Sequence, residues 1–198
     1  MQLIDAIYKR RAVRSFQSTP VSEELLQELL RAAVQAPSAV NRQPWAFAII
    51  EGRELLRDYS DRAKKHLLGI LQPGAEVYEL RDMIADPNFN IFYDAGTLVV
   101  ICARNSDPGA AEDCCLAAEN FMLAAVDFGL ATCPIGFARP WLNTPEAKRD
   151  LNLPDQYTVV MPLIVGYPAT VELPPVERKA PDIIARKPSE LVELHQTL

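Results

Sequence analysis

The chain has 198 residues and a mass of 22.0 kDa, which suffices for one substantial hydrophobic core and does not require a second domain. Apolar residues make up 49% of it and charged residues 23%, which is typical of a soluble globular protein and excludes a disordered one. A net charge of -6 argues against general affinity for nucleic acid or for a membrane surface, and no apolar run is long enough to span a bilayer. We therefore expect a cytoplasmic protein whose partner is a small molecule.

The N-terminal segment predicts a helix over residues 2–8 that is followed by a cluster of cations. Lys9, Arg10, Arg11 and Arg14, set against Asp5, give the first twenty residues a net charge of +3, so the remainder carries -9. One interpretation is that the cations complement the dipole at the end of the helix, although Arg14 lies beyond it. The other is an anion site, because guanidinium groups bind phosphate oxygens through charge-assisted hydrogen bonds. The residues alone leave both interpretations open.

The next elements are a helix, a polar loop and a strand. Ser22 is a suitable N-cap for a helix that extends to about residue 35, and Pro37 ends it. The loop from Pro37 to Trp45 is rich in hydroxyl and amide groups, and an apolar strand follows over residues 46–50. Loops held between a helix and a strand are common places for ligand sites.

The middle of the chain predicts a buried strand between two long helices. A polar-faced helix over residues 53–68 leads into an irregular segment, residues 75–90, which we interpret as a surface excursion or lid. The unbroken apolar run over residues 98–103 indicates a strand buried on both faces in mid-sheet. The longest helix, residues 110–128, ends at Gly129, and its small apolar residues indicate a central or intersubunit position.

The last third predicts short elements and an extended arm. Thr144 is a suitable N-cap for a short helix, and a strand follows over residues 157–165. Pro162 within that strand predicts an edge position or a bulge. Residues 168–182 are rich in proline and predict an arm, and Ser189 to Leu194 predict a short closing helix.

Nucleophilic and metal chemistry find little support. His66 lies beside Lys64 and Lys65, and His195 lies in the tail, so both histidines are expected to be solvated and no catalytic triad can be assembled. Metal-type spacing is absent among the cysteines, which we expect to be buried free thiols: Cys102, Cys114, Cys115 and Cys133. Glycine-rich phosphate loops are also absent. If the protein is an enzyme, a cofactor should therefore carry the chemistry, because the side chains offer no catalytic group of their own. The interleaved helices and strands predict an α+β sheet wrapped by helices.

Five motifs, weak one by one, occur in register across nearly the whole chain. They are Arg10-Arg11-Ala12-Val13-Arg14, the Pro-Ser-x-x-Asn-x-Gln-Pro-Trp run from Pro37 to Trp45, the run from Phe128 to Gly136, Gly166-Tyr167-Pro168, and Arg186-Lys187-Pro188. Together they resemble the FMN-dependent nitroreductase family. The segment between Gly69 and Asn90 falls outside the resemblance.

The resemblance implies a nitroreductase-like α+β fold with a mostly antiparallel sheet, in an intertwined homodimer with two FMN sites at the subunit interface. One domain would span residues 1–198, with residues 169–198 as an arm that embraces the partner subunit. Arg10, Arg11 and Arg14, with Ala12 between them, would hold the phosphate and ribityl end, and Arg186 would add a phosphate contact. The flavin would meet one loop of the other subunit, made of Pro37, Ser38, Ala39 and Asn41. The isoalloxazine ring would lie along Pro134, Ile135 and Gly136, with a backbone N–H near Gly136 directed at flavin N5.

Two departures from the family pattern stand out. The family often has Ser where this chain has Ala12 and Ala39, so backbone groups must replace two hydroxyl contacts. Relatives that remove iodine from iodotyrosine use a lid with a Glu, a Tyr and a Lys. This chain offers Glu76, Tyr78 and Glu79 but no Lys between Lys65 and Lys148, so that reaction is not expected.

The leading hypothesis is an NAD(P)H-dependent oxidoreductase with a ping-pong cycle, in which hydride reaches FMN N5 and then an electron-poor acceptor such as a nitroaromatic or a quinone. Such a cycle needs no protein acid or base for hydride transfer, which agrees with the absence of a catalytic histidine. The alternatives are a flavin-binding storage protein, a relative that consumes its own flavin, or a protein whose arginines only cap a helix. The physiological acceptor and the choice of NADH or NADPH do not follow from the sequence.

Overall fold

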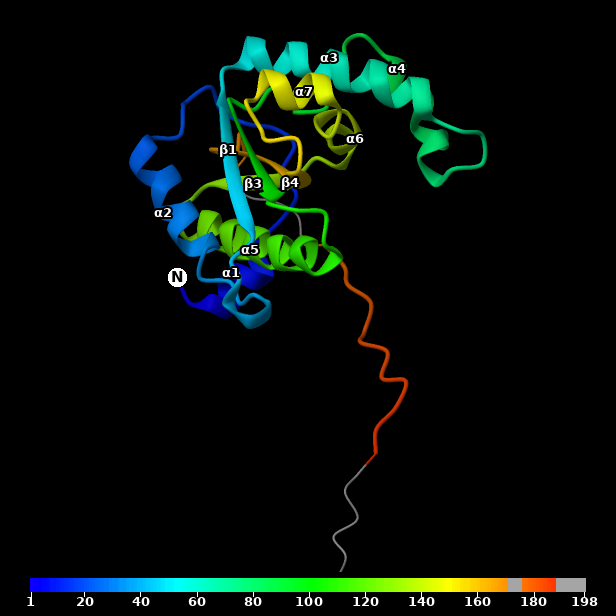
Figure 1. Ribbon diagram of the computed structural model, residues 1–198. Helices are drawn as coiled ribbons and strands as arrows, with labels where there is room; N and C mark the ends of the chain where they lie inside the picture. Colours follow the sequence, from blue (N-terminus) through cyan, green and yellow to red (C-terminus); the bar gives the residue numbers. More distant parts are fainter. Residues whose placement is uncertain (171–175, 188–198) are drawn as a thin grey trace, which may run out of the picture.

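The computed structural model describes residues 1–170 and 176–187 of the chain (Figure 1). In chain order the elements are α1 (Leu3–Lys9), α2 (Glu23–Ala33), η1 (Ala39–Asn41), β1 (Trp45–Glu51), α3 (Arg53–Ile70), η2 (Glu76–Leu80), α4 (Arg81–Ala85), β2 (Thr97–Ala103), α5 (Pro108–Asp127), β3 (Ala131–Pro134), η3 (Gly136–Ala138), α6 (Arg139–Leu142), α7 (Pro145–Asp150) and β4 (Thr158–Gly166), where η denotes a 3-10 turn. An antiparallel sheet surrounded by helices confirms the predicted α+β fold. The organisation as one domain with an arm from residue 169 stays a prediction.

The strands are ordered β1-β2-β4-β3, and every neighbouring pair is antiparallel. All residues of β2 are buried, which confirms the predicted mid-sheet strand. Its side chains alternate between two hydrophobic cores: Val99 and Ile101 belong to one, and Leu98 and Val100 to the other. The sheet therefore separates two apolar layers, and each layer needs its own cover of helices.

Helix α5 covers one face of the sheet and contacts all four strands, with α1 and α2 packed on its outer side. Helices α3 and α6 cover the opposite face (Figure 1). The central position predicted for the longest helix is thus confirmed. Small residues such as Ala117 and Ala125 are fully buried, and they allow the helix backbone to approach the strands closely.

The predicted helix boundaries are set by the expected caps. The Ser22 hydroxyl oxygen accepts a hydrogen bond from the Leu25 N–H at 3.3 Å, and the Thr144 hydroxyl oxygen accepts one from the Ala147 N–H at 3.2 Å. Gly129, just past the end of α5, has a φ of 70°, a left-handed conformation that glycine adopts without steric cost.

Pro162 lies in β4, an interior strand, so the edge position predicted as one alternative is wrong. The other alternative, a bulge, is found close to the proline. The register of β2 and β4 shifts beside it: Ile101 pairs with Met161, whereas Cys102 pairs with Val159. The residue skipped by this shift is Val160, so the β-bulge lies two positions before Pro162, which itself pairs with Val100.

Two terminal segments carry exposed apolar side chains. On α1, Leu3, Ile4, Ile7 and Tyr8 are between 45% and 74% exposed, whereas Ala6 is buried. The arm over residues 176–187 has no helix or strand, is exposed throughout and runs away from the body of the molecule (Figure 1). The short helix predicted from Ser189 to Leu194 lies outside the described residues.

None of the helices in the described ranges combines the length and the apolar character needed to cross a lipid bilayer. Over the same ranges, no three His, Cys, Asp or Glu side chains gather as metal ligands would.

The cysteines are free thiols, but they are not all buried as expected. Cys102, Cys114 and Cys133 are buried, whereas Cys115 is exposed because successive residues of a helix point about 100° apart. Burial raises the pKa of Cys102 to about 11 and that of Cys114 to about 12, and it also raises the pKa of Cys133. Since the thiolate is the reactive form, these three thiols should be inert in the folded protein.

We predict that a thiol reagent such as Ellman's reagent labels one cysteine of the native protein at neutral pH and all four in denaturant. Absorbance of the released chromophore gives the count. In a Cys115→Ser variant the native protein should not be labelled. Rapid labelling of two or more cysteines before unfolding would contradict the described burial.

Candidate functional site

The segment after the cationic cluster lies along the edge of the sheet. The Val13 N–H donates to the Thr132 carbonyl oxygen of β3 at 3.0 Å, and the Gln17 N–H donates to the Tyr167 carbonyl oxygen at 2.9 Å. Extended backbone places successive side chains on opposite sides, so Val13 is buried while Arg14 is exposed. This pairing fixes Arg14 beside the end of β3.

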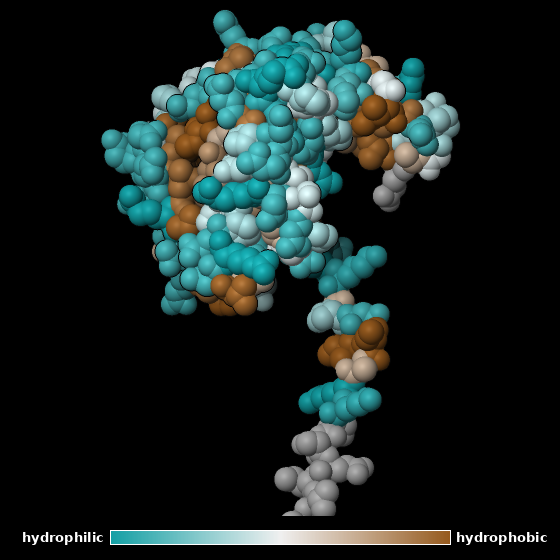
Figure 2. Space-filling model, in the orientation of Figure 1, coloured by the Kyte–Doolittle hydropathy of each residue, from teal (hydrophilic) through white to brown (hydrophobic). Residues whose placement is uncertain are grey.

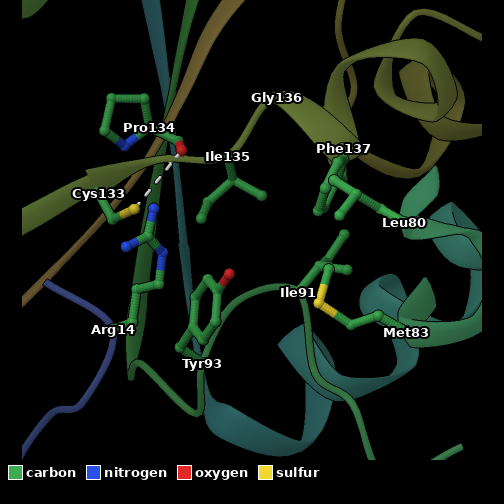
Figure 3. A pocket seen from close by; sticks show the side chains of 10 residues that line it. All are labelled: Arg14, Leu80, Met83, Ile91, Tyr93, Cys133, Pro134, Ile135, Gly136 and Phe137. Carbon is green, nitrogen blue, oxygen red and sulfur yellow. Dashed lines mark hydrogen bonds between the residues drawn. The ribbon is translucent and has the colours of Figure 1, made fainter. Parts of the chain in front are cut away.

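Arg14 faces a pocket of about 350 Å³ between the end of β3 and the predicted lid (Figure 3). Four separate segments contribute its lining: Arg14; Leu80 and Met83; Ile91 and Tyr93; and the run Cys133, Pro134, Ile135, Gly136 and Phe137. Figure 3 shows Arg14 and Tyr93 side by side on one wall, with Leu80 and Met83 on the opposite wall. The pocket is therefore polar at one end and apolar at the other.

The electrostatics of the pocket depend on a single formal charge. Among the described residues that line it, Arg14 alone is ionised at neutral pH, and its guanidinium carbon lies 5.7 Å from the centre of the Tyr93 ring. Burial raises the pKa of the Cys133 thiol, and the nearby charge of Arg14 only partly opposes that shift. Cys133 is thus held as a neutral thiol, whose Sγ donates to the Pro134 carbonyl oxygen at 3.6 Å.

The run Pro134-Ile135-Gly136 presents backbone to the pocket. The Ile135 N–H is already used, because it donates to the Pro162 carbonyl oxygen at 2.9 Å. The next N–H, that of Gly136, opens the turn η3, and the first N–H groups of such a turn have no partner within it. This leaves a backbone donor next to the pocket.

The segment expected to be a lid does overhang the pocket. Leu80 ends η2 and Met83 lies in α4, and both are 40% exposed. Figure 2 shows apolar side chains gathered on this overhang, with the molecule hollowed beneath it. The overhang is tied to α3 by Lys64, whose ammonium group donates to the carbonyl oxygens of Asp86 at 3.1 Å and Phe89 at 2.7 Å.

The other two arginines of the cluster do not reach this pocket. Arg11 Nη1 donates to the Tyr8 carbonyl oxygen at 2.6 Å and to the Arg10 carbonyl oxygen at 2.8 Å, which are contacts of the helix-cap type. Arg10 pairs with Glu119 of α5 at 3.3 Å. Arg11 instead lines a second pocket of about 600 Å³, next to the C-terminal end of α5. Ala12 forms an isolated bridge with Thr132 between the two pockets.

The Pro37–Asn41 loop is held at the far end of α5. The Ala39 N–H lies 3.3 Å from both carboxylate oxygens of Asp113, and the Ser38 hydroxyl oxygen accepts from the Gln43 N–H at 3.0 Å. Asp113 and Val126, which lines the Arg11 pocket, are thirteen residues apart, about 20 Å along the helix axis. Arg11 therefore lies far from the loop within one chain, whereas Arg10, which pairs with Glu119, lies beside the middle of the helix.

The structure thus brings together Arg14, Pro134, Ile135 and Gly136 in one pocket. It leaves Arg10, Arg11 and Ala12 beside it, and the Pro37–Asn41 loop at the other end of α5. Arg186 is exposed and belongs to the arm, which runs away from the body of the molecule (Figure 1). The roles expected of these residues toward a flavin stay predictions.

Sequence reasoning missed the residues that complete the pocket, above all Tyr93. Its place in an irregular stretch just before the buried strand β2 is a weak signal that loops beside rigid strands tend to carry sites. Leu80, Met83 and Phe137 gave no signal, because an apolar residue that lines a pocket has the same pattern as one that packs in a core.

Comparison with known proteins supplies independent information. A protein-family model described as the nitroreductase family matches residues 7–167. The NADH dehydrogenase of Thermus thermophilus is 49% identical over 45 residues, which are 23% of this chain and 22% of that protein. The matches to it and to two further curated relatives cover 22%, 34% and 29% of those proteins' own length.

Two longer matches cover most of the fold. An iodotyrosine deiodinase from Thermotoga neapolitana is 28% identical over 174 residues, which are 84% of this chain and 88% of that protein. The crystal structure of a nitroreductase with bound FMN from Bacteroides fragilis superposes with a TM-score of 0.79 and 24% identity, over 96% of this chain and 100% of that chain. At that identity the likeness concerns the fold alone. Because the family model spans most of the sequence, the conclusion is that this chain belongs to the nitroreductase family.

Proposed function

We propose that the protein is an FMN-dependent oxidoreductase that takes electrons from NAD(P)H and passes them to an electron-poor acceptor such as a nitroaromatic or a quinone. The observation that carries the proposal is the pocket that joins Arg14 to the Pro134-Ile135-Gly136 backbone. Membership of the nitroreductase family, a relative named as an NADH dehydrogenase and a structural neighbour with bound FMN support it.

The residues present fit a flavin. FMN combines a flat, largely apolar ring with polar edges and an anionic tail, and the pocket offers apolar walls, a backbone donor at Gly136 and one guanidinium group. A volume of about 350 Å³ lies within the range of small-molecule sites. Pro134, Ile135 and Gly136 would hold the ring, and Arg14 would bind its polar or anionic part.

When bound, FMN would supply the redox chemistry, accepting a hydride from the nicotinamide and delivering one to the acceptor in alternation. The protein would bind and orient the reactants, because no carboxylate or imidazole occurs among the described residues of the pocket lining. The neutral Cys133 thiol provides no nucleophile at neutral pH. Leu80 and Met83 would exclude water from above.

The deiodinase reaction finds no support in the pocket despite the similarity to iodotyrosine deiodinase. Recognition of an amino acid's charged ends needs charged partners, and the described overhang contributes the apolar side chains of Leu80 and Met83 to the pocket. An uncharged, flat acceptor suits this wall better.

We further propose that the active form is a homodimer. The Pro37–Asn41 loop lies near the N-terminal end of α5 and the pocket lined by Arg11 lies near its C-terminal end, so a second copy would be needed to bring these two parts of the expected site together. The exposed apolar side chains of α1 provide surface that association would bury. The arm that carries Arg186 would then contact the partner subunit.

Steady-state oxidation of NADH or NADPH by the purified yellow protein tests the enzymatic function. We expect turnover that depends on an added nitroaromatic or quinone and that saturates with acceptor. Flavin that copurifies without any turnover, at every acceptor concentration, would favour a storage role instead. A colourless protein that leaves FMN fluorescence unquenched would remove the flavin assignment altogether.

Replacement of Arg14 by alanine should weaken FMN binding by about 2 kcal/mol, roughly thirtyfold, because a charge-assisted hydrogen bond is lost. Titration of the apo-protein, followed by quenching of flavin fluorescence, gives the dissociation constant. Arg31→Ala is the matched control, since Arg31 lies on α2 and pairs with Glu28. Equal affinities in the two variants would show that the pocket does not hold the anionic part of FMN.

Flavin binding and dimerisation should be thermodynamically coupled, because a ligand that binds only the dimer stabilises the dimer by mass action. We expect added FMN to raise the melting temperature and to oppose dissociation on dilution, as measured by light scattering. A chain that ends after residue 170 keeps the hydrogen bond from the Ala169 N–H to the Ser15 carbonyl oxygen but lacks the arm, and both properties should weaken in it. A flavin-loaded protein that stays monomeric at micromolar concentration would exclude the idea.

A further inference from the structure

The turn that carries Tyr93 has a backbone conformation that few residues adopt. Tyr93 has a φ of 52° and Asp94 a φ of 55°, so two successive residues with side chains are left-handed. This region is uncommon for a bulky residue because Cβ approaches its own backbone. Such conformations persist where the surrounding structure fixes them, and they concentrate at functional sites.

The contacts that fix this turn come from two buried polar side chains, Asn90 and Ser60, and from one exposed ion pair. Asn90, which is 6% exposed, accepts a hydrogen bond from the Phe92 N–H at 2.9 Å and donates one to Asp94 at 2.9 Å. Asp94 also pairs with Arg57 of α3 at 2.9 Å. The fully buried Ser60 hydroxyl oxygen accepts from the Ile91 N–H at 3.0 Å. Two side chains of α3 therefore hold the turn in place.

The strained turn presents Tyr93 to Arg14. The guanidinium carbon of Arg14 lies 5.7 Å from the centre of the Tyr93 ring, within the range of a cation–π contact. The Tyr93 ring also meets Phe89 edge-on, with ring centres 5.8 Å apart, and this contact limits its movement. Among the described residues no carboxylate forms an ion pair with Arg14, so the ring is the partner that the structure gives this cation.

Stacking on an aromatic ring has a particular consequence for arginine. A guanidinium group that packs its flat face on a ring keeps its N–H donors, which lie in its plane, for other partners. A long side chain held in this way before binding loses less freedom when a ligand arrives. In Figure 3 the Arg14 side chain stands beside the Tyr93 ring and is directed toward Cys133 and Pro134.

We propose that Tyr93 is a positioning residue, whose ring holds the Arg14 guanidinium group in the orientation that binds the flavin. This inference rests on the proposed function of the pocket. The backbone strain at Tyr93 and Asp94 is then the cost of placing an aromatic ring against a cation that would otherwise move freely in solvent.

A double-mutant cycle with Tyr93→Leu and Arg14→Ala tests the inference, with FMN affinity read from quenching of flavin fluorescence. Tyr93→Leu should weaken FMN binding about two- to fivefold when Arg14 is present, the size of an exposed cation–π contact, and should have little effect in the Arg14→Ala background. Tyr93→Phe should bind as the parent does, because it keeps the ring. Tyr157→Leu is a control at another arginine: the Arg104 guanidinium carbon lies 5.9 Å from the centre of the Tyr157 ring and Arg104 Nη1 donates to the Tyr157 hydroxyl oxygen at 3.2 Å, and Tyr157 does not line this pocket.

Two results would overturn the role of Tyr93: equal effects of Tyr93→Leu in both backgrounds, or a loss in Tyr93→Phe as large as in Tyr93→Leu, which would assign the effect to the hydroxyl group.

A second measurement needs no flavin. NMR relaxation of the Arg14 Nε–H group in the apo-protein should show a restrained side chain in the parent and in Tyr93→Phe, and a freer one in Tyr93→Leu. Equal mobility in all three proteins would refute the inference even if FMN binds, whereas failure of the parent to bind FMN would refute the proposed function.

Discussion

The site depends on the hydrogen bonds between the segment after the arginine cluster and the edge of the sheet. Residues 13–17 bond to Thr132 and Tyr167, and Ser15 accepts from the Ala169 N–H, so the N-terminal segment is joined to β3 and to the end of β4. An uncovered edge strand offers unpaired backbone groups to other chains, and this segment covers part of that edge. The same bonds determine which side of the segment faces the pocket.

This pairing also accounts for a glycine that the resemblance identified without a physical reason. At Gly166 a Cβ atom would lie 3.0 Å from the Phe16 ring, a tight contact that would require the ring to shift by a few tenths of an ångström. The backbone of β4 can approach the N-terminal segment this closely because the side chain is absent. The Gly166-Tyr167-Pro168 turn is therefore a packing requirement that fixes the position of Arg14 indirectly.

The arginine cluster has more than one role, and its members are separated by local geometry. Arg10 and Arg11 lie within reach of α1 and α5 and bond to a carboxylate and to backbone carbonyl groups there. Arg14 lies on extended backbone, beyond the helix, where its nearest partner is an aromatic ring. A charge whose partner is a ring, and not a carboxylate, keeps its donors available to an anion.

The amino-acid sequence by itself determined most of the helices and the strands β1, β2 and β4. Ser22 and Thr144 predicted helix starts, Gly129 a helix end, and the unbroken apolar run in β2 a central strand, because caps, left-handed glycine and two-sided burial are local properties. The motif resemblance placed Arg14 and the Pro134-Ile135-Gly136 run in one site. Only the tertiary structure decided which residues complete that pocket, since Tyr93 and Met83 reach it from segments distant in sequence and carry no periodic signal. The tertiary structure also decided that Pro162 lies in an interior strand, because the order of strands in a sheet depends on pairing between distant segments. The bulge near it likewise depends on the register of both β2 and β4.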